Sequence, residues 1–393
     1  MESKTLLLDP QSSSSERSIW RINPGTKFLA SKVRLGNFRI QNNSGLPIYF
    51  GTQGIYSLIL RVSLLNLDGT EIDRLAGDGL NMMAIRLLAA ENGQQYSINR
   101  QLAQSMCDSI TCPSPSQVQL TEVAGKDNAC VLSAYIDISA MLKYLSARNI
   151  IDEGMIVQCE WNLPTMIQNG YSFDRFPCLF IDEVISDLPA DKGTTFTFPT
   201  IISERLVIPY VGGDVLQTYA KRLNAYYNQY IANMYYFLIT DPHYELNVGN
   251  PFNLAYAPDQ ESMVFTLDGV QLIPFGSINT VAKKLALLTD FNGPVTVPTL
   301  ASVYNNVKAY LPDSDVAWGC KNPNTGVTMS GVQSYGCIKL ARMITNDITM
   351  SYTANLLNES SSSLVMLAEC MRTYNKTTGI VGNLSTNPVM LNV

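Results

Sequence analysis

The feature that most constrains this chain is a segment that recurs about 200 residues further along. Residues 67–93 and 267–293 are identical at seven of 27 positions without a gap, whereas average amino-acid frequencies predict roughly two matches. Both segments contain Leu-Asp-Gly at the start and Asn-Gly at the end. Each copy has the pattern of a strand, a turn and a helix, so we expect that a whole domain has been duplicated.

Cysteines extend the repeat if small insertions are allowed. Cys130 and its neighbour Val131 resemble Cys337 and Ile338, and Cys159 lies in its strand pattern much as Cys370 does. A polar stretch that is typical of a linker, residues 189–193, separates the halves. The expected organisation is a flexible Ser-rich arm at 1–22, domains at 23–190 and 191–385, and a C-terminal tail at 386–393.

Alternating apolar and polar residues predict strands in both halves. The alternation is clear in residues 132–139, 155–162 and 348–354, and a period of two indicates a half-buried strand. Residues 364–373 read as a strand that returns beside 348–354, so we expect an antiparallel hairpin there. Gly36 and Asn37 stand where the alternation changes parity, which predicts a β-bulge.

Helices are predicted to be few and short. Residues 140–145 are helix-like, and 80–88 and 277–288 each have one apolar helical face followed by Asn-Gly. Residues 216–230 are ambiguous, because their apolar spacing suits a helix while their tyrosines favour strands. We interpret them as a helix that passes into a strand at 234–240. The expected class is all-β with a few short helices, in two β-sandwich domains.

The low charge content limits what the protein can bind. Charged residues make up 15% of the 393 residues and the net charge is −6, against about 25% charged residues in an average soluble protein. A protein that grips nucleic acid needs a basic patch, and none is visible, so we predict no sequence-specific nucleic-acid binding. A weakly charged surface suits broad subunit contact, although a generic β-rich protein would have the same composition.

The sequence has none of the usual marks of membrane insertion or export. No apolar run approaches the roughly 20 residues of a membrane span, and the apolar run at residues 6–8 is too short for a signal peptide. We therefore predict no membrane span and no secretion, and we expect the eight cysteines to be reduced.

Residues that could support catalysis or metal binding are sparse. The single histidine, His243, cannot supply a multi-histidine metal site, and no Gly-x-Ser-x-Gly motif accompanies it. The adjacent carboxylates of Asp152-Glu153 and Asp182-Glu183 point to opposite faces of a strand, and Asp313 with Asp315 are too few for calcium. We predict no catalytic, cofactor-binding or metal site.

A group of aromatic side chains needs a separate interpretation. It could bind sugars or single-stranded nucleic acid by stacking, but few basic residues accompany it, so we favour core or subunit interface. The group consists of Tyr226, Tyr227, Tyr230, Tyr235 and Tyr236.

Several segments together resemble a known family. They are GIYSLILRV at 54–62 followed by Leu-Asp-Gly, the strand–helix–strand pattern of 132–161, FTLDGVQL at 265–272, and the closing strands 348–352 and 364–374. Their order resembles that of the double jelly-roll major capsid proteins of polinton-like, adintovirus-like and virophage-like double-stranded DNA elements. The chain is shorter than most eukaryotic members, which implies shorter surface loops.

The resemblance implies a fold and an assembly. Each half would be an eight-stranded jelly roll, and three chains would form a homotrimer with a pseudo-hexagonal outline that packs with neighbouring capsomers into an icosahedral shell. Penton and minor capsid proteins would be further partners, and the location would be the virion. Independently of the resemblance, we expect the arm and the tail to order only on assembly, because each is polar or irregular and lies outside a strand pattern. Two other classes stay open: a two-domain carbohydrate-binding or attachment protein, and a β-sandwich glycoside hydrolase or lyase.

Overall fold

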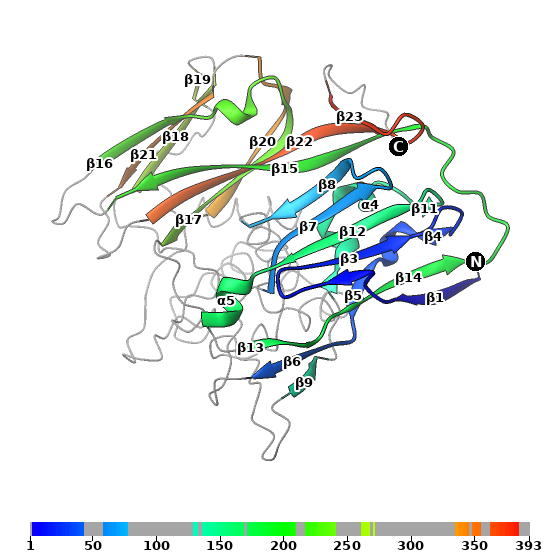
Figure 1. Ribbon diagram of the computed structural model, residues 1–393. Helices are drawn as coiled ribbons and strands as arrows, with labels where there is room; N and C mark the ends of the chain where they lie inside the picture. The colour runs from blue at the N-terminus through cyan, green and yellow to red at the C-terminus, as the bar shows by residue number, and fades with distance from the viewer. Residues whose placement is uncertain are drawn as a thin grey trace, which may run out of the picture.

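The computed structural model describes two β-sandwiches in tandem (Figure 1). Helices are few and short among the described residues, and none there is long and apolar enough to cross a membrane. The described residues are 2–42, 58–77, 129–132, 136–168, 171–209, 217–240, 261–267, 270–271, 335–345, 348–354 and 362–384.

The first sandwich has two main sheets. Sheet 1A runs β1-β14-β5-β10, with β4 also paired with β14 and β11 paired with β4. A shorter sheet, β13-β6-β9, is formed by the strands that lie next to β14, β5 and β10 in the chain. Sheet 1B runs β2-β3-β12-β7-β8. The bounds are β1 Ser3–Leu8, β2 Ser12–Ser13, β3 Arg17–Ile22, β4 Phe28–Leu29, β5 Arg34–Gly36, β6 Phe38–Asn42, β7 Ile59–Asn66, β8 Glu71–Ala76, β9 Ala129–Leu132, β10 Ile136–Asp137, β11 Ile150–Ile151, β12 Met155–Trp161, β13 Tyr171–Arg175 and β14 Cys178–Val184.

The second sandwich also has two sheets. Sheet 2A runs β15-β22-β17-β20, with β23 beside β22, and sheet 2B runs β16-β21-β18-β19. The bounds are β15 Thr195–Ile208, β16 Gln217–Arg222, β17 Tyr230–Thr240, β18 Glu261–Leu267, β19 Val270–Gln271, β20 Tyr335–Met343, β21 Ile348–Ala354, β22 Ser362–Asn375 and β23 Ile380–Asn383.

Strand pairing is nested in the same way in both sandwiches. In the second, the first strand pairs with the last (β15 with β22), then β16 with β21, β17 with β20, and β18 with β19. In the first, β1 pairs with β14, β3 with β12, β5 and β6 with β10 and β9, and β7 with β8. This order over eight strand positions is that of a jelly roll, and the two copies have identical connectivity.

The repeated Leu-Asp-Gly lies at the same hairpin in both copies. In the first, it connects β7 to β8, where Gly69 has a φ of 92° and the amide of Thr70 donates to Asp68 Oδ1 at 2.9 Å. In the second, β18 and β19 pair directly across residues 268–269. Gly adopts such a φ without strain, which explains the glycine in the first copy.

Of the two cysteine matches expected between the copies, one is confirmed and one is wrong. Cys130 in β9 and Cys337 in β20 do occupy equivalent strands. The match of Cys159 with Cys370 is wrong, because Cys159 lies in β12, the seventh strand, and Cys370 in β22, the eighth. The strand equivalent to β22 in the first copy is β14, which begins at Cys178.

Three further predictions need correction, all for reasons of strand pairing. Residues 1–22 are no arm that waits for assembly, because they contain β1, β2 and β3, and β1 pairs with β14 over six residues. Strands 348–354 and 362–375 exist but form no hairpin, since β21 belongs to sheet 2B and β22 to sheet 2A. In a jelly roll most connections pass from one sheet to the other, and the connection from β21 to β22 is one of them, so adjacency in sequence misleads there.

The Tyr-rich segment is the third correction. Instead of a helix, its described part forms β16, a 3₁₀ turn η4 at Asn224–Tyr226 and the start of β17. In β16 half-buried and exposed residues alternate, and the strand pairs with β21 throughout. Long-range pairing therefore overrides the helical spacing. The predicted strand at 234–240 is correct, as it lies within β17.

Other local predictions are confirmed where the structure describes them. Asn37 has a φ of 59° between β5 and β6, so the backbone is irregular where the alternation changes parity, while the β-bulge itself stays a prediction. The predicted short helix appears as α3 (Ile138–Met141) and α4 (Lys143–Ser146), and α5 spans Leu163–Gln168. The helices expected at 80–88 and 277–288 and the tail at 386–393 lie outside the described residues.

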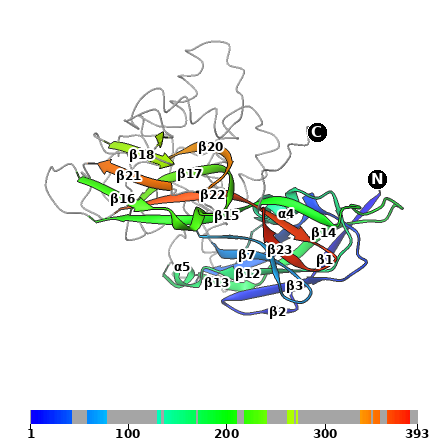
Figure 2. The ribbon, with the colours of Figure 1, turned by 90° about the horizontal axis from the view of Figure 1, so that it is seen from above.

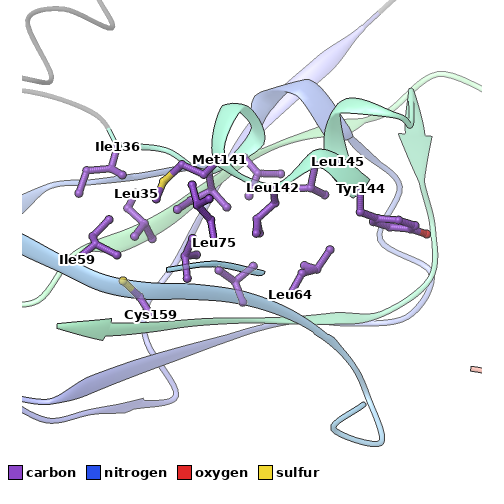
Figure 3. Close-up of a cluster of buried hydrophobic side chains, with 14 of the residues drawn as sticks. Leu35, Ile59, Leu64, Leu75, Ile136, Met141, Leu142, Tyr144, Leu145 and Cys159 are labelled. Carbon is purple, nitrogen blue, oxygen red and sulfur yellow. The ribbon is translucent and has the colours of Figure 1, made fainter. Parts of the chain in front are cut away.

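Two hydrophobic cores hold the sandwiches together. The first fills the space between sheets 1A and 1B and is covered by α3 and α4 (Figure 3). Leu142 and Leu145 point between the two sheets, while the ring of Tyr144, which belongs to the same core, points toward its end (Figure 3). The second core lies between sheets 2A and 2B and includes Met350, Tyr352 and Met366. Five residues of the second sandwich join the first core instead: Phe198, Tyr235, Val365, Leu367 and Tyr374.

Candidate functional site: the junction between the two sandwiches

The carboxylate pairs considered as catalytic candidates serve structural contacts. Glu153 binds the guanidinium of Arg148, with Nη1 to Oε1 at 2.6 Å. Asp182 accepts a hydrogen bond from Thr5 Oγ1 at 2.9 Å and pairs with Arg34 at 3.3 Å. Neither pair is arranged as a cooperating acid and base across a cleft. His243 and the two residues considered for calcium, Asp313 and Asp315, lie outside the described residues.

Metal binding finds no support in the described part of the chain. Those ranges contain no group of three or more His, Cys, Asp or Glu that could hold an ion. Three described cysteines are buried and free: Cys159, Cys178 and Cys370. Burial raises the pKa of Cys370 to about 12 and that of Cys159 well above its ordinary value, so their thiols stay protonated.

Most of the tyrosines in the group considered for stacking are buried. Tyr226 is fully buried and its hydroxyl donates to the carbonyl oxygen of Met366 at 2.9 Å. Tyr230 and Tyr235 are also buried, whereas Tyr227 is exposed. Tyr235 packs into the core of the first sandwich from sheet 2A. The group therefore contributes to packing within and between the sandwiches, and the side chain of Tyr236 is outside what the structure describes.

The feature that stands out is the contact between the sandwiches. The outer face of sheet 2A lies against β8 and α4 of the first sandwich (Figures 1 and 2). Along β22, residues 364, 366, 368 and 370 face the second core, while Val365 and Leu367 join the first. Sheet 2A is therefore a middle layer with both faces buried, which explains eight consecutive buried residues at 363–370.

An aromatic cluster forms one end of this contact. The ring of Tyr144, from α4, makes edge contacts with Phe198, Tyr374 and Phe196 at centroid distances of 5.2, 5.5 and 6.2 Å. All three partners belong to the second sandwich, on β15 and β22. Edge-to-face pairs contribute about 0.5–1.5 kcal/mol each beyond the area they bury, so Tyr144 is a major anchor between the domains.

A buried arginine ties the same region to the connecting segment. The side chain of Arg148 is 0% exposed and lies between Glu153 and Asp191, with Nε to Asp191 Oδ2 at 2.8 Å. Its guanidinium carbon stands 3.6 Å from the ring centroid of Phe196, a cation–π contact. Burial raises the pKa of both carboxyls, but hydrogen bonds from Arg148 outweigh it, so both pKa values lie below their ordinary range.

A buried carboxylate completes the junction. Asp73 of β8 is 1% exposed. It accepts hydrogen bonds from the backbone amide of Tyr144 at 2.9 Å and from the hydroxyl of Thr200 on β15 at 3.2 Å. Burial raises the pKa of Asp73 to about 6, and these hydrogen bonds offset only part of the desolvation. The junction thus holds an acid that titrates near neutral pH.

Comparisons with known proteins find similarity in structure but none in sequence. The sequence matches no family model and no curated protein. The structure is similar to a chain of the Sputnik virophage (TM-score 0.56, 10% identity, covering 100% of this chain and 90% of that one). It is also similar to a chain of the PBCV-1 virus capsid (0.53, 12%, 98% and 97%) and to the mavirus major capsid protein (0.52, 9%, 97% and 90%).

This chain has the double jelly-roll fold. Each of these three matches covers at least 97% of this chain and at least 90% of the similar chain. The nested strand pairing of both sandwiches is the structural basis of the similarity. At 9–12% identity the likeness concerns the fold alone. The expected fold class, all-β with two tandem eight-stranded jelly rolls and a few short helices, is confirmed.

The residues that join the halves of this double jelly roll were missed by sequence reasoning. Arg148 stands five residues from Glu153 but 43 from Asp191, so no local pattern connects all three. The sequence places Glu153 in a pair of adjacent carboxylates and Asp191 in the polar stretch 189–193, so neither is expected to share a buried cation. Asp73 gave no sequence signal either, because it stands between Ile72 and the exposed Arg74 in β8 and is buried only through contacts with the distant residues Tyr144 and Thr200.

Proposed function

We propose that the chain is a viral major capsid protein whose function is self-assembly. In this proposal three chains form a homotrimer with a pseudo-hexagonal outline, and trimers pack with one another into an icosahedral shell. The observation that carries the proposal is the repetition of one nested topology in two sandwiches of the same chain. Three such chains contain six sandwiches of one connectivity, which suits a six-sided tile with threefold symmetry.

The comparisons support this class of function. The similar chains come from the PBCV-1 virus capsid, the Sputnik virophage and the mavirus major capsid protein. A capsid role also agrees with the low charge content of 15%, because weakly charged faces lose little solvation when they are covered.

A structural role fits the chemistry of the described residues. The candidate carboxylates Glu153 and Asp182 are engaged in ion pairs, and Cys159 and Cys370 are buried with raised pKa values. We therefore propose a non-catalytic protein without cofactor or metal. Its location would be the virion, and penton and minor capsid proteins would be its further partners.

The domain division belongs to the same proposal. We place the boundary at residue 190, in the connection between Val184 at the end of β14 and Thr195 at the start of β15. The first jelly roll then begins with β1 at Ser3 rather than after residue 22. Each of the two units would occupy one corner of the pseudo-hexagonal tile.

The mass of the full chain in solution tests the proposal. Size exclusion with light scattering should give three times the 43.4 kDa of one chain, about 130 kDa. Negative-stain images of the same peak should show pseudo-hexagonal particles or closed shells. A monomer that fails to assemble at any concentration or ionic strength would contradict it. Specific glycan binding by that monomer would then favour the attachment class.

A further inference from the structure

Three neighbouring strands of sheet 2A hold an amide against a buried carboxyl group. Strands β20, β17 and β22 lie side by side in that order (Figure 1). Asn233 of β17 is half-buried, and its Nδ2 donates to Glu369 Oε2 of β22 at 2.6 Å. Glu369 is only 5% exposed. Carboxyl groups are seldom buried this far in proteins, so this contact with a side-chain amide is a candidate for a chemical role.

A lysine occupies the third position of the same row. The register of β17 and β20 places Lys339 directly opposite Asn233. Residues that stand opposite each other in an antiparallel pair belong to one face of the sheet, with Cβ atoms about 4.5–5.5 Å apart. Met234, the next residue of β17, lies in the second core. The row of Lys339, Asn233 and Glu369 therefore belongs to the outer face of sheet 2A.

The strand pairing is irregular on both sides of Asn233. Toward β22, residues 232–233 together stand opposite one residue, Glu369. Toward β20, the register shifts between Ile231 and Asn233, and Ala341 in the same interval of β20 has a φ of 48°. Bulges redirect a side chain and are frequent beside active sites. Two irregularities at one residue thus fit a side chain that is directed toward its neighbours in the row.

The row lies beside the contact with the first sandwich. On the neighbouring row of the same face, Leu367 and Tyr235 are 0% and 3% exposed and belong to the first core. Ile201, opposite Glu369 on β15, also packs against that core. Packed apolar side chains limit the access of water and hold neighbouring groups in one geometry, and a fixed geometry accelerates a reaction between two side chains.

We propose that Lys339 and Asn233 form an isopeptide bond once the chain has folded. The neutral amine of Lys339 attacks Cγ of Asn233, so that a bond from Nζ to Cγ forms, the bond from Cγ to Nδ2 breaks, and ammonia leaves. Glu369 accepts the proton of the attacking nitrogen and passes it to Nδ2, which its Oε2 already contacts, so the carboxyl group is regenerated. One amine and one amide give one amide and one ammonia, without an oxidant.

The bond would join the third and sixth strands of the second jelly roll. It closes a loop that contains β18 and β19, and a cross-link over a long loop restricts the unfolded chain strongly. A cross-linked sheet 2A would therefore resist unfolding beside the contact with the first sandwich. The inference goes beyond the capsid proposal and does not depend on it, because the reaction takes place within one chain.

The intact mass of the full chain after denaturation tests the bond. Wild type should weigh one ammonia, about 17 Da, less than its sequence. Trypsin should release a branched peptide that joins residues 223–283 to 322–342, because it does not cleave after an acylated lysine. Lys339→Arg and Asn233→Ala should each have the full mass of their sequence. Lys4→Arg, at an exposed strand lysine outside the row, is the matched control and should keep the loss.

Two further variants test the chemistry. Asn233→Asp should lose one water, about 18 Da, in place of ammonia, and its product should have the same mass as cross-linked wild type. Glu369→Gln should lower the cross-linked fraction at least ~10-fold at a fixed time, because the proton-transfer group is gone. An unchanged fraction in Glu369→Gln overturns the role of that carboxyl.

The wild-type measurement decides the proposal without relying on the folding of any variant. A wild type with the full mass of its sequence overturns the isopeptide bond. A wild type that loses ammonia but gives no branched peptide overturns it as well, because an asparagine can also lose ammonia alone. Either result leaves the capsid proposal untouched, since the mass of the denatured chain does not depend on assembly.

Discussion

The two sandwiches have the same connectivity but opposite surroundings for their equivalent sheets. In β22 eight consecutive residues, 363–370, are buried, because sheet 2A lies between its own core and the first sandwich. In the equivalent β14, buried and half-buried residues mix, because only one face of sheet 1A meets a core. The comparison teaches that strand order sets the topology, whereas the neighbouring layer sets the hydrophobic pattern of a strand.

The largest expected effect comes from breaking the junction that creates this difference. Arg148→Ala leaves Glu153 and Asp191 without their shared cation in a buried site, so the free energy of unfolding should fall by about 3–5 kcal/mol. Urea unfolding at one fixed protein concentration measures it. Arg61→Ala is the control: its side chain is 32% exposed beside Glu71, and we expect a loss of about 0–1 kcal/mol. Equal losses for both variants would show that the junction adds no stability.

A second pair of variants compares the equivalent faces directly. Leu367→Ala removes a side chain that is 0% exposed on the outer face of 2A, and should cost about 2–5 kcal/mol. Leu7→Ala removes one that is 48% exposed on the outer face of 1A, and should stay within about 0.5 kcal/mol in the dissociated chain. Denaturant titrations of dilute protein give both values. A large loss for Leu7→Ala in the monomer would mean that both faces are covered within one chain.

The same contrast explains what could be predicted from the sequence. Strand periodicity and the repeated Leu-Asp-Gly were sufficient for the class and the duplication, because both are local signals. The pairing of β21 with β22 was mispredicted, since sheet membership depends on contacts far apart in the chain. The junction was missed for a similar reason: Tyr144 and Phe198 are 54 residues apart in the chain and meet only where the two sandwiches pack together.

The third prediction concerns the titration of Asp73 at the junction. Its pKa is about 6 in the folded chain against 3.8 as the ordinary value, so the folded state binds the proton more tightly than the unfolded state. The contribution of Asp73 to stability is therefore greatest below pH 4, and is lost as pH rises through 6, by at most about 1.4 kcal/mol per pH unit. The difference in unfolding free energy between wild type and Asp73→Asn, measured from pH 4 to 7, should follow this trend.

Asp68 supplies the control of opposite sign. Hydrogen bonds from Thr70 hold the pKa of the Asp68 carboxyl below its ordinary value, so its contribution is present near neutral pH and is lost on acidification. Asp68→Asn should therefore change the pH profile in the other direction. If Asp73→Asn runs parallel to the wild type across this range, the carboxyl of Asp73 does not titrate at the junction.

The smallest expected effect concerns a residue with a positive φ. Each sandwich has one such residue where its third strand pairs with its sixth. In the first it is Asn37, with a φ of 59° on the third strand, and in the second it is Ala341, with a φ of 48° on the sixth. Asn tolerates the left-handed region, whereas Ala is strained there by about 1–2 kcal/mol. Ala341→Gly should therefore stabilise the protein by up to about 1 kcal/mol, after the entropic cost of Gly is subtracted.

Melting temperatures of three glycine variants test this last comparison. Ala341 is exposed, so its replacement removes no packing. Asn37→Gly should change stability by less than about 0.5 kcal/mol, because Asn already accepts this conformation. Ala76→Gly, at the end of β8, should destabilise by about 0.5–1 kcal/mol, as expected for Gly in a strand. If Ala341→Gly behaves like Ala76→Gly, the positive φ at Ala341 carries no strain, and the two irregularities differ only in position.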